Sequence, residues 1–259
     1  KRRQGVDLCR VKRCKSGQER PCMAEILGAW SFLMERKGIN MDKLAKGIEE
    51  MKEHNYEQAA KWFTETIDEN PEEPLGYINF GNLLLHMKDY ERAQRFFERA
   101  IEKDSHAATA YYGLGNTFYD QEDYARAQEQ FLRAIEEGLN EADVHFMMGM
   151  TFMHQDHQRL ALPYLMTAAE MDEDDIDIQF QYGLCLAQNE DIEHAENQMN
   201  HVLQLESNHS DAHYNLGVIA LYKEDADTAL KHFNQALKIQ PEHMLAANGK
   251  KQLENLLDN

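Results

Sequence analysis

Histidine and cysteine are the side chains of this sequence that could bind a metal ion. His154 and His157 are three residues apart, and His209 and His213 are four apart. Each pair could therefore share one face of a helix, as zinc ligands often do. Both pairs, however, span a predicted helix end or turn, and no set of carboxylates converges on them. We therefore expect no functional metal site at these histidines.

The cysteines are divided unevenly along the chain. Cys9, Cys14 and Cys22 lie near the start, whereas Cys185 is alone in the rest of the sequence. The spacing of the first three does not match a paired Cys-x-x-Cys zinc pattern, and no histidine lies nearby. Cys185 has no partner for an internal disulfide, which is consistent with a reducing compartment. We expect no cofactor and a cytoplasmic location.

Motifs of catalysis, nucleic-acid binding and membrane insertion are missing. The sequence has no nucleophile–base signature, phosphate-binding loop or dinucleotide fingerprint. Its formal charge of −19 combines +6 in residues 1–40 with −25 in the remainder. An acidic body is repelled by phosphate backbones and anionic lipids, and no apolar run is long enough to span a bilayer. We therefore expect a non-catalytic protein that binds neither nucleic acid nor membranes.

Two series of small residues set the organisation of the chain. Glycine recurs every 34 residues, and alanine follows in step twelve residues behind. The series are Gly47, Gly81, Gly115, Gly149, Gly183 and Gly217, and Ala59, Ala93, Ala127, Ala161, Ala195 and Ala229. Apolar residues at i, i+3, i+4 and i+7 around each glycine predict a helix, and a turn and a second helix follow. A fixed period of this length indicates a repeat array.

This pattern resembles the tetratricopeptide repeat (TPR). With the glycine numbered as place 8, the TPR motif has large residues at places 4 and 7, Ala at 20, Phe or Tyr at 24, Ala at 27 and Pro near 32. The repeat around Gly81 fits it with Tyr77, Phe80, Ala93 and Phe97. The resemblance covers residues 41–243, and the chain looks like the small bacterial proteins made of little but TPRs.

The resemblance implies an all-α fold, a right-handed α-solenoid of six 34-residue helix-turn-helix repeats with a C-terminal capping helix. The expected repeats are 41–73, 74–107, 108–141, 142–175, 176–209 and 210–243, and the expected capping helix is 244–259. Lys43 and Lys46 in the first repeat are expected to face water, as in an N-terminal cap. Pro163 is tolerable if its helix starts just upstream.

Residues 1–40 lie outside the repeats. A basic stretch is followed by a short apolar one and then by Glu35, Arg36, Lys37 and Gly38. These four residue types are encoded by purine-rich codons, as in a translated ribosome-binding site just before a start codon. We hypothesise that Met41 is the biological start and that residues 1–40 are a non-native or disordered leader.

The resemblance also implies a ligand groove. In TPR arrays the first helices line a concave groove, and places 2, 5, 9, 12 and 13 face it. Here these places, with the adjacent place 6, carry aromatic, methionine, amide and acidic side chains. The candidate groove residues are Asn79, Asn82, Tyr112, Asn116, Tyr119, Asp143, Phe146, Met150, Met153, Asp177, Phe180, Asp211, Tyr214 and Asn215. Lysines that a carboxylate clamp for chaperone tails needs are missing from places 2, 5 and 6.

This composition predicts a protein or peptide partner with apolar and basic residues. Aromatic and methionine side chains suit a peptide, Asn82 and Asn116 could hydrogen-bond its backbone, and the aspartates favour Lys or Arg. The aromatic residues could instead pack only against neighbouring repeats, and the asparagines could be ordinary surface residues. We expect a non-catalytic interaction scaffold, monomeric or weakly self-associating. The alternatives are a self-associating structural protein and a receptor for a short signalling peptide.

Overall fold

Residues 41–257 are described by the structure, a computed structural model, and within this range every regular element is a helix. The hypothesis of a leader at residues 1–40 concerns residues outside the described range. The chain divides into two compact units, Lys1–Leu139 and Asn140–Asn259, which we call unit 1 and unit 2. Each unit is considered by itself.

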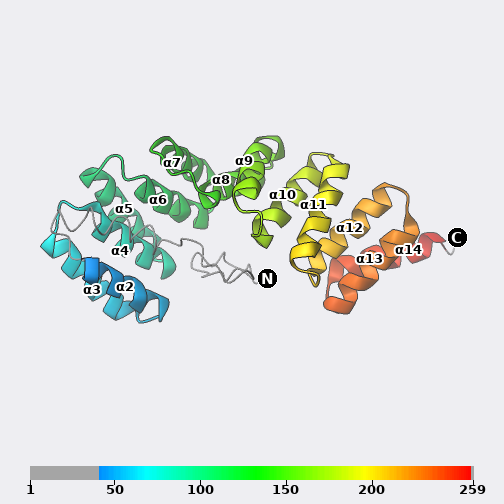
Figure 1. Ribbon diagram of the computed structural model, residues 1–259, viewed down its shortest axis with the longest axis horizontal. Helices are drawn as coiled ribbons and strands as arrows, with labels where there is room; N and C mark the ends of the chain where they lie inside the picture. Colours follow the sequence, from blue (N-terminus) through cyan, green and yellow to red (C-terminus); the bar gives the residue numbers. More distant parts are fainter. Residues whose placement is uncertain (1–40, 258–259) are drawn as a thin grey trace. The chain divides into compact units, whose positions relative to one another are not determined.

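Residues 41–139 of unit 1 form three helix pairs (Figure 1). The pairs are α2 (Met41–Lys52) with α3 (Tyr56–Glu69), α4 (Pro74–His86) with α5 (Tyr90–Lys103), and α6 (Ala108–Asp120) with α7 (Tyr124–Glu136). The two helices of a pair pack on each other, and the second helix also packs on the first helix of the next pair. The second helices α5 and α7 therefore bury one apolar stripe, whereas the first helices α4 and α6 are buried on several sides.

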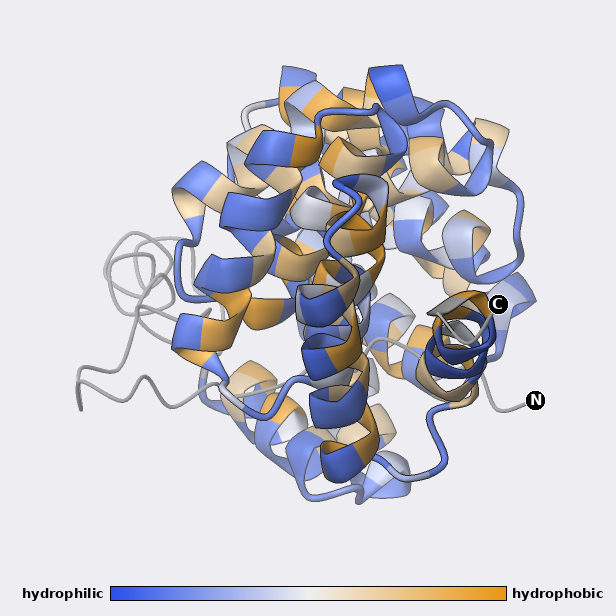
Figure 2. Cartoon of the chain, turned by 90° about the vertical axis from the view of Figure 1, so that its right-hand side faces the viewer, coloured by the Kyte–Doolittle hydropathy of each residue, from blue (hydrophilic) through white to orange (hydrophobic). Residues whose placement is uncertain are grey.

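Residues 140–257 of unit 2 form three pairs and one further helix. The pairs are α8 (Ala142–His154) with α9 (Gln158–Met171), α10 (Ile176–Gln188) with α11 (Ile192–Leu205), and α12 (Ser210–Tyr222) with α13 (Ala226–Ile239). The last helix, α14 (Met244–Leu257), buries Ala246 and Leu253 in the same cluster as Phe233 of α13. The connecting turns are mostly hydrophilic, and the hydrophobic residues lie mainly on the helices (Figure 2).

The recurring glycines lie where the two helices of a pair touch. A Cβ atom on Gly115 would lie 2.6 Å from Cε1 of the fully buried Phe131. The glycines at Gly47, Gly81 and Gly217 face Phe63, Phe97 and Phe233 in the same way. The alanines of the second series are fully buried as well. Small side chains at these two places allow the backbones to approach closely, which explains why both recur.

The turn inside each pair has the same construction. Its left-handed residue is not glycine: His54, Lys88, Glu122, Asp156, Glu190 and Glu224 have φ between 57° and 65°. In the last of these turns, the Asp225 amide donates to the Ala220 carbonyl at 2.9 Å. The Asp225 carboxylate then accepts from the Thr228 amide at 3.0 Å and caps α13. Asp89, Asp123 and Asp191 cap their helices equivalently, which stabilises each helix start.

Pro163 lies deeper in its helix than the sequence suggested. Helix α9 begins at Gln158, so Pro163 is the sixth helical residue and not part of the first turn. Proline has no backbone N–H, and the hydrogen bond that this position would donate to the Arg159 carbonyl is therefore missing. The condition of a helix start just upstream is therefore not met, because the turn geometry shared by all repeats fixes the start of α9.

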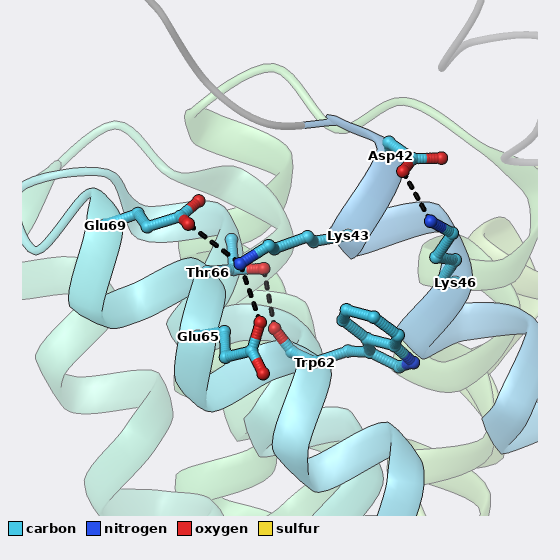
Figure 3. Close-up of polar contacts among 7 residues, drawn as sticks. All are labelled: Asp42, Lys43, Lys46, Trp62, Glu65, Thr66 and Glu69. Atoms are coloured by element: carbon cyan, nitrogen blue, oxygen red, sulfur yellow. Dashed lines mark hydrogen bonds and ion pairs between the residues drawn. The ribbon is translucent and has the colours of Figure 1, made fainter.

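Lys43 does not simply face water. Its Nζ donates to the Glu65 carboxylate at 2.6 Å and to the Glu69 carboxylate at 2.8 Å, across the seam between α2 and α3 (Figure 3). These two contacts raise the pKa of the Lys43 ammonium. Lys46 is exposed, as expected, and lies 5.3 Å from the centre of the Trp62 ring. The first pair thus uses an ion pair where later pairs place aromatic or amide side chains.

Candidate functional site

Five of the candidate groove residues lie on α4 and α6 of unit 1. Two are the tyrosines Tyr112 and Tyr119, which are half-buried and rest on the second helix of their pair. The Tyr112 ring is 5.8 Å from the Phe131 ring, and the Tyr119 ring is 5.6 Å from the Tyr124 ring. Burial raises the pKa of Tyr119, so its hydroxyl keeps its proton at neutral pH and can act as a donor. Helix α7 therefore holds both rings in place while leaving part of each accessible.

The three asparagines on α4 and α6 have different environments. Asn79 donates to the Leu75 carbonyl of its own helix at 2.8 Å, and Asn82 is half-buried. Asn116 is only 3% exposed, yet its Oδ1 atom has no hydrogen-bond partner. An unsatisfied buried acceptor costs about 1–3 kcal/mol. Among residues 41–257, the only other buried side-chain atom in this state is Nδ1 of His145.

The other nine candidates lie on α8, α10 and α12 of unit 2, and they form rows at equal repeat places. The first row, Asp143, Asp177 and Asp211, is exposed at the helix starts. In the second row Phe180 and Tyr214 are half-buried, whereas Phe146 is only 9% exposed. Met150 and Met153 are half-buried further along α8. Asn215 donates to the Asp211 carbonyl of its own helix at 2.8 Å.

The aromatic residues of unit 2 pack against histidines that precede the next first helix. The Phe180 ring is 4.7 Å from the His209 ring, and the Tyr214 ring is 5.3 Å from the His243 ring. His243 Nε2 donates to the Asp211 carboxylate at 3.0 Å. The competing interpretation from the sequence, that these rings pack between repeats, thus describes part of their environment.

Comparison with known proteins identifies the family. Residues 44–106, 78–142 and 112–161, and separately residues 210–243, match sequence profiles of the tetratricopeptide repeat. The solved structure of YrrB, a TPR protein with an unusual peptide-binding site, is 42% identical to the chain with a TM-score of 0.70. The similarity covers 74% of this chain and 99% of YrrB. The chain belongs to the tetratricopeptide repeat family.

Two further solved structures have a similar fold. PilF of Pseudomonas aeruginosa has a TM-score of 0.74 at 16% identity, over 84% of this chain and 99% of PilF. MamA of Desulfovibrio magneticus RS-1 has a TM-score of 0.60 at 22% identity, over 64% of this chain and 94% of MamA. No curated protein matches the chain in sequence. The predicted all-α fold of stacked TPR helix pairs is confirmed, and TPR proteins are generally non-catalytic interaction modules.

The TPR register also identifies exposed residues that the candidate set omitted. Val218, Leu221 and Tyr222 are 41%, 37% and 69% exposed at the end of α12. They lie 4, 7 and 8 residues after Tyr214, which places them on the same side of the helix. His209 and His243, one repeat apart, were omitted as well. Their proximity to Phe180 and Asp211 depends on how consecutive TPRs pack, which a motif match does not specify.

The metal candidates do not come together in this TPR chain. His154 and His157 are exposed, and no group of three or more His, Cys, Asp or Glu side chains with metal-binding geometry occurs within residues 41–257. Cys185 is buried, and burial raises the pKa of its thiol to about 11, so it is not activated as a nucleophile. Cys9, Cys14 and Cys22 lie outside the described residues.

Within residues 41–257, none of the helices α2 to α14 is both long and apolar enough to cross a membrane.

Proposed function

We propose that this TPR protein is a non-catalytic scaffold that binds peptide segments of partner proteins on the first-helix faces of its repeats. The observation that carries the proposal is the unsatisfied Oδ1 of Asn116, which lies between Tyr112 and Tyr119 along α6. Because Oδ1 is buried in the structure, the Asn116 side chain would have to rotate toward the surface before a backbone N–H of a bound peptide could satisfy this acceptor. The two tyrosine rings would supply apolar area on either side of it.

Support for peptide as the ligand class comes from YrrB, a relative with a peptide-binding site. The scaffold is largely preformed, since α7 already holds both tyrosine rings by packing, and little ordering cost would fall on it. In unit 2, the exposed Asp177 and Asp211 would favour lysine or arginine in the ligand. A partner with apolar and basic residues therefore fits the chain best. We place this interaction in a reducing compartment such as the cytoplasm.

The proposal is tested by selecting peptides from a random display library on the full chain and titrating the selected peptides. Tyr112→Ala should weaken binding by at least tenfold, because it removes an aromatic contact at the centre of the unit 1 face. Leu132→Ala is the matched control, since Leu132 is exposed on α7, a second helix. Equal affinities for both variants and the unchanged protein would contradict peptide binding at this face.

Self-association is a second candidate, and the exposed apolar residues of unit 2 favour it. Met244, Leu245 and Leu256 of α14 are 76%, 57% and 76% exposed. Terminal repeats usually present a polar outer surface. Light scattering decides between the candidates: a mass that stays monomeric at high concentration rules out self-association, and a Leu256→Lys variant that dissociates an oligomer supports it.

A further inference from the structure

One pair of side chains lines the seam between the two helices of each repeat, at places 4 and 23 of the TPR. Tyr77 and Phe96 form this seam pair between α4 and α5, with ring centres 6.4 Å apart. In unit 2 the seam pair is polar in every repeat. It is His145 with Tyr164 at 6.4 Å, then Gln179 accepting a hydrogen bond from Gln198, then His213 with His232.

The last seam pair brings two imidazoles into direct contact. Nδ1 of His213 on α12 and Nδ1 of His232 on α13 are 3.1 Å apart, and both side chains are half-buried. One nitrogen must donate a proton and the other must accept it. If both rings were protonated, no acceptor would remain and two positive charges would face each other across the seam.

The surroundings of the pair offer little compensation for a second charge. His209 at the start of α12 is a further potential cation close to His213, and it lowers the pKa of that ring. Glu196 on α11 faces His232 and would favour its protonated form, but Glu196 also accepts from Lys223 Nζ at 2.5 Å. His243, which precedes α14, is engaged with Asp211. A hydrogen bond with the backbone of Ser207 favours the charged form of His213.

Burial is the first cause that lowers the pKa of both imidazoles below the ordinary value. In the unfolded chain each ring would recover a pKa near 6.5. The unfolded state therefore binds more protons than the folded state below that pH. Stability from the pair is fully present above pH 6.5 and falls as the pH drops through 6.5.

We propose that His213 and His232 form an acid-sensitive clasp that holds α12 and α13 together at neutral pH and releases them when both rings take up protons. The clasp goes beyond the proposed function and operates whether or not unit 2 binds a peptide. Release would expose the seam of the last TPR, where Phe233 and Ala236 are fully buried.

The expected size of the effect follows from proton linkage. Consider a histidine that stays neutral in the folded state and has a pKa near 6.5 when unfolded. Lowering the pH from 7 to 5 then raises the equilibrium constant for opening by about 25-fold. If the closed clasp excludes one proton, the protection of the α12 and α13 amides against hydrogen exchange should fall by about 25-fold. Exclusion of both protons predicts about 600-fold.

The test compares amide hydrogen exchange in α12 and α13 at pH 7 and pH 5, corrected for intrinsic exchange rates. The variant His213→Gln with His232→Gln copies the seam pair of the preceding repeat, Gln179 and Gln198, and should lose the acid dependence. A second variant, His213→Tyr with His232→Phe, copies Tyr77 and Phe96 and gives the same test if the glutamine pair folds poorly. The control, His154→Gln with His157→Gln, removes two exposed histidines of the same unit and should keep the dependence.

Two results would overturn the clasp. One is an acid loss of protection that is the same in the unchanged protein and in both seam variants. The other is an NMR titration in which the rings of His213 and His232 each take up a proton near pH 6.5 without opening the seam.

Discussion

Replacing Gly115 with alanine tests the close approach on which every repeat depends. The new Cβ would lie 2.6 Å from Cε1 and 2.7 Å from Cδ1 of Phe131. Carbon atoms pack best at about 3.5–4.0 Å, and Phe131 is fully buried, so its ring has no free space to enter. Overpacking costs about 1–3 kcal/mol, and the better helix propensity of alanine returns about 1 kcal/mol. We expect a net loss of about 1 kcal/mol, and at most about 2 kcal/mol.

Gly183→Ala is the matched control. Its Cβ would lie 2.9 Å from Cε of Met199 and 3.2 Å from Cγ of Gln198. Both atoms belong to flexible side chains that can move aside, and methionine adapts easily to irregular space. The helix propensity of alanine should then dominate, so that Gly183→Ala is neutral or stabilising by up to about 1 kcal/mol.

The assay combines thermal unfolding by circular dichroism with amide hydrogen exchange in each helix pair, because a repeat protein need not unfold as one unit. The double variant Gly115→Ala with Phe131→Met copies the pair Gly183 and Met199, apart from the added methyl group. It should lose less stability than the two single variants added together. Equal losses for Gly115→Ala and Gly183→Ala would refute the packing explanation of the glycine series.

Three further changes test the turns and caps. Pro163→Ala should raise stability by about 1–2 kcal/mol in chemical denaturation, because it restores a helical hydrogen bond. Glu224→Gly should raise the melting temperature slightly, since glycine adopts the observed φ of 61° without strain; a lower value would contradict this. Asp123→Ala should cost about 1 kcal/mol at pH 7. Contacts with Arg126 lower the pKa of Asp123, so this cost should vanish as the pH falls below about 4.

The sequence was sufficient for the fold because the repeat positions of small residues have a direct physical cause. Gly115 and Ala127 recur where helices touch, and the structure shows the same contact around Gly115 and Gly217. The register then placed Tyr112 and Tyr119 on a partly exposed helix face, as the structure has them. Periodicity could do this because it reports which side of a helix is buried.

Other features depend on contacts between residues far apart in the chain. Lys43 was expected to face water, but Glu65 and Glu69 lie opposite it on α3. Asn116 was predicted as a candidate ligand contact, but its burial and its unsatisfied Oδ1 require the packed structure. The contact of His213 with His232 likewise depends on packing, since the two histidines are 19 residues apart on different helices.

Asn116→Leu tests most directly whether the unsatisfied Asn116 serves peptide binding at the expense of stability. Leucine has a similar volume and no acceptor, so the variant should be as stable as the unchanged protein or more stable, by up to about 1–3 kcal/mol. The same variant should bind a library-selected peptide at least tenfold more weakly in calorimetric titration. Unchanged affinity, or a variant that is destabilised and loses binding only through unfolding, would contradict the account.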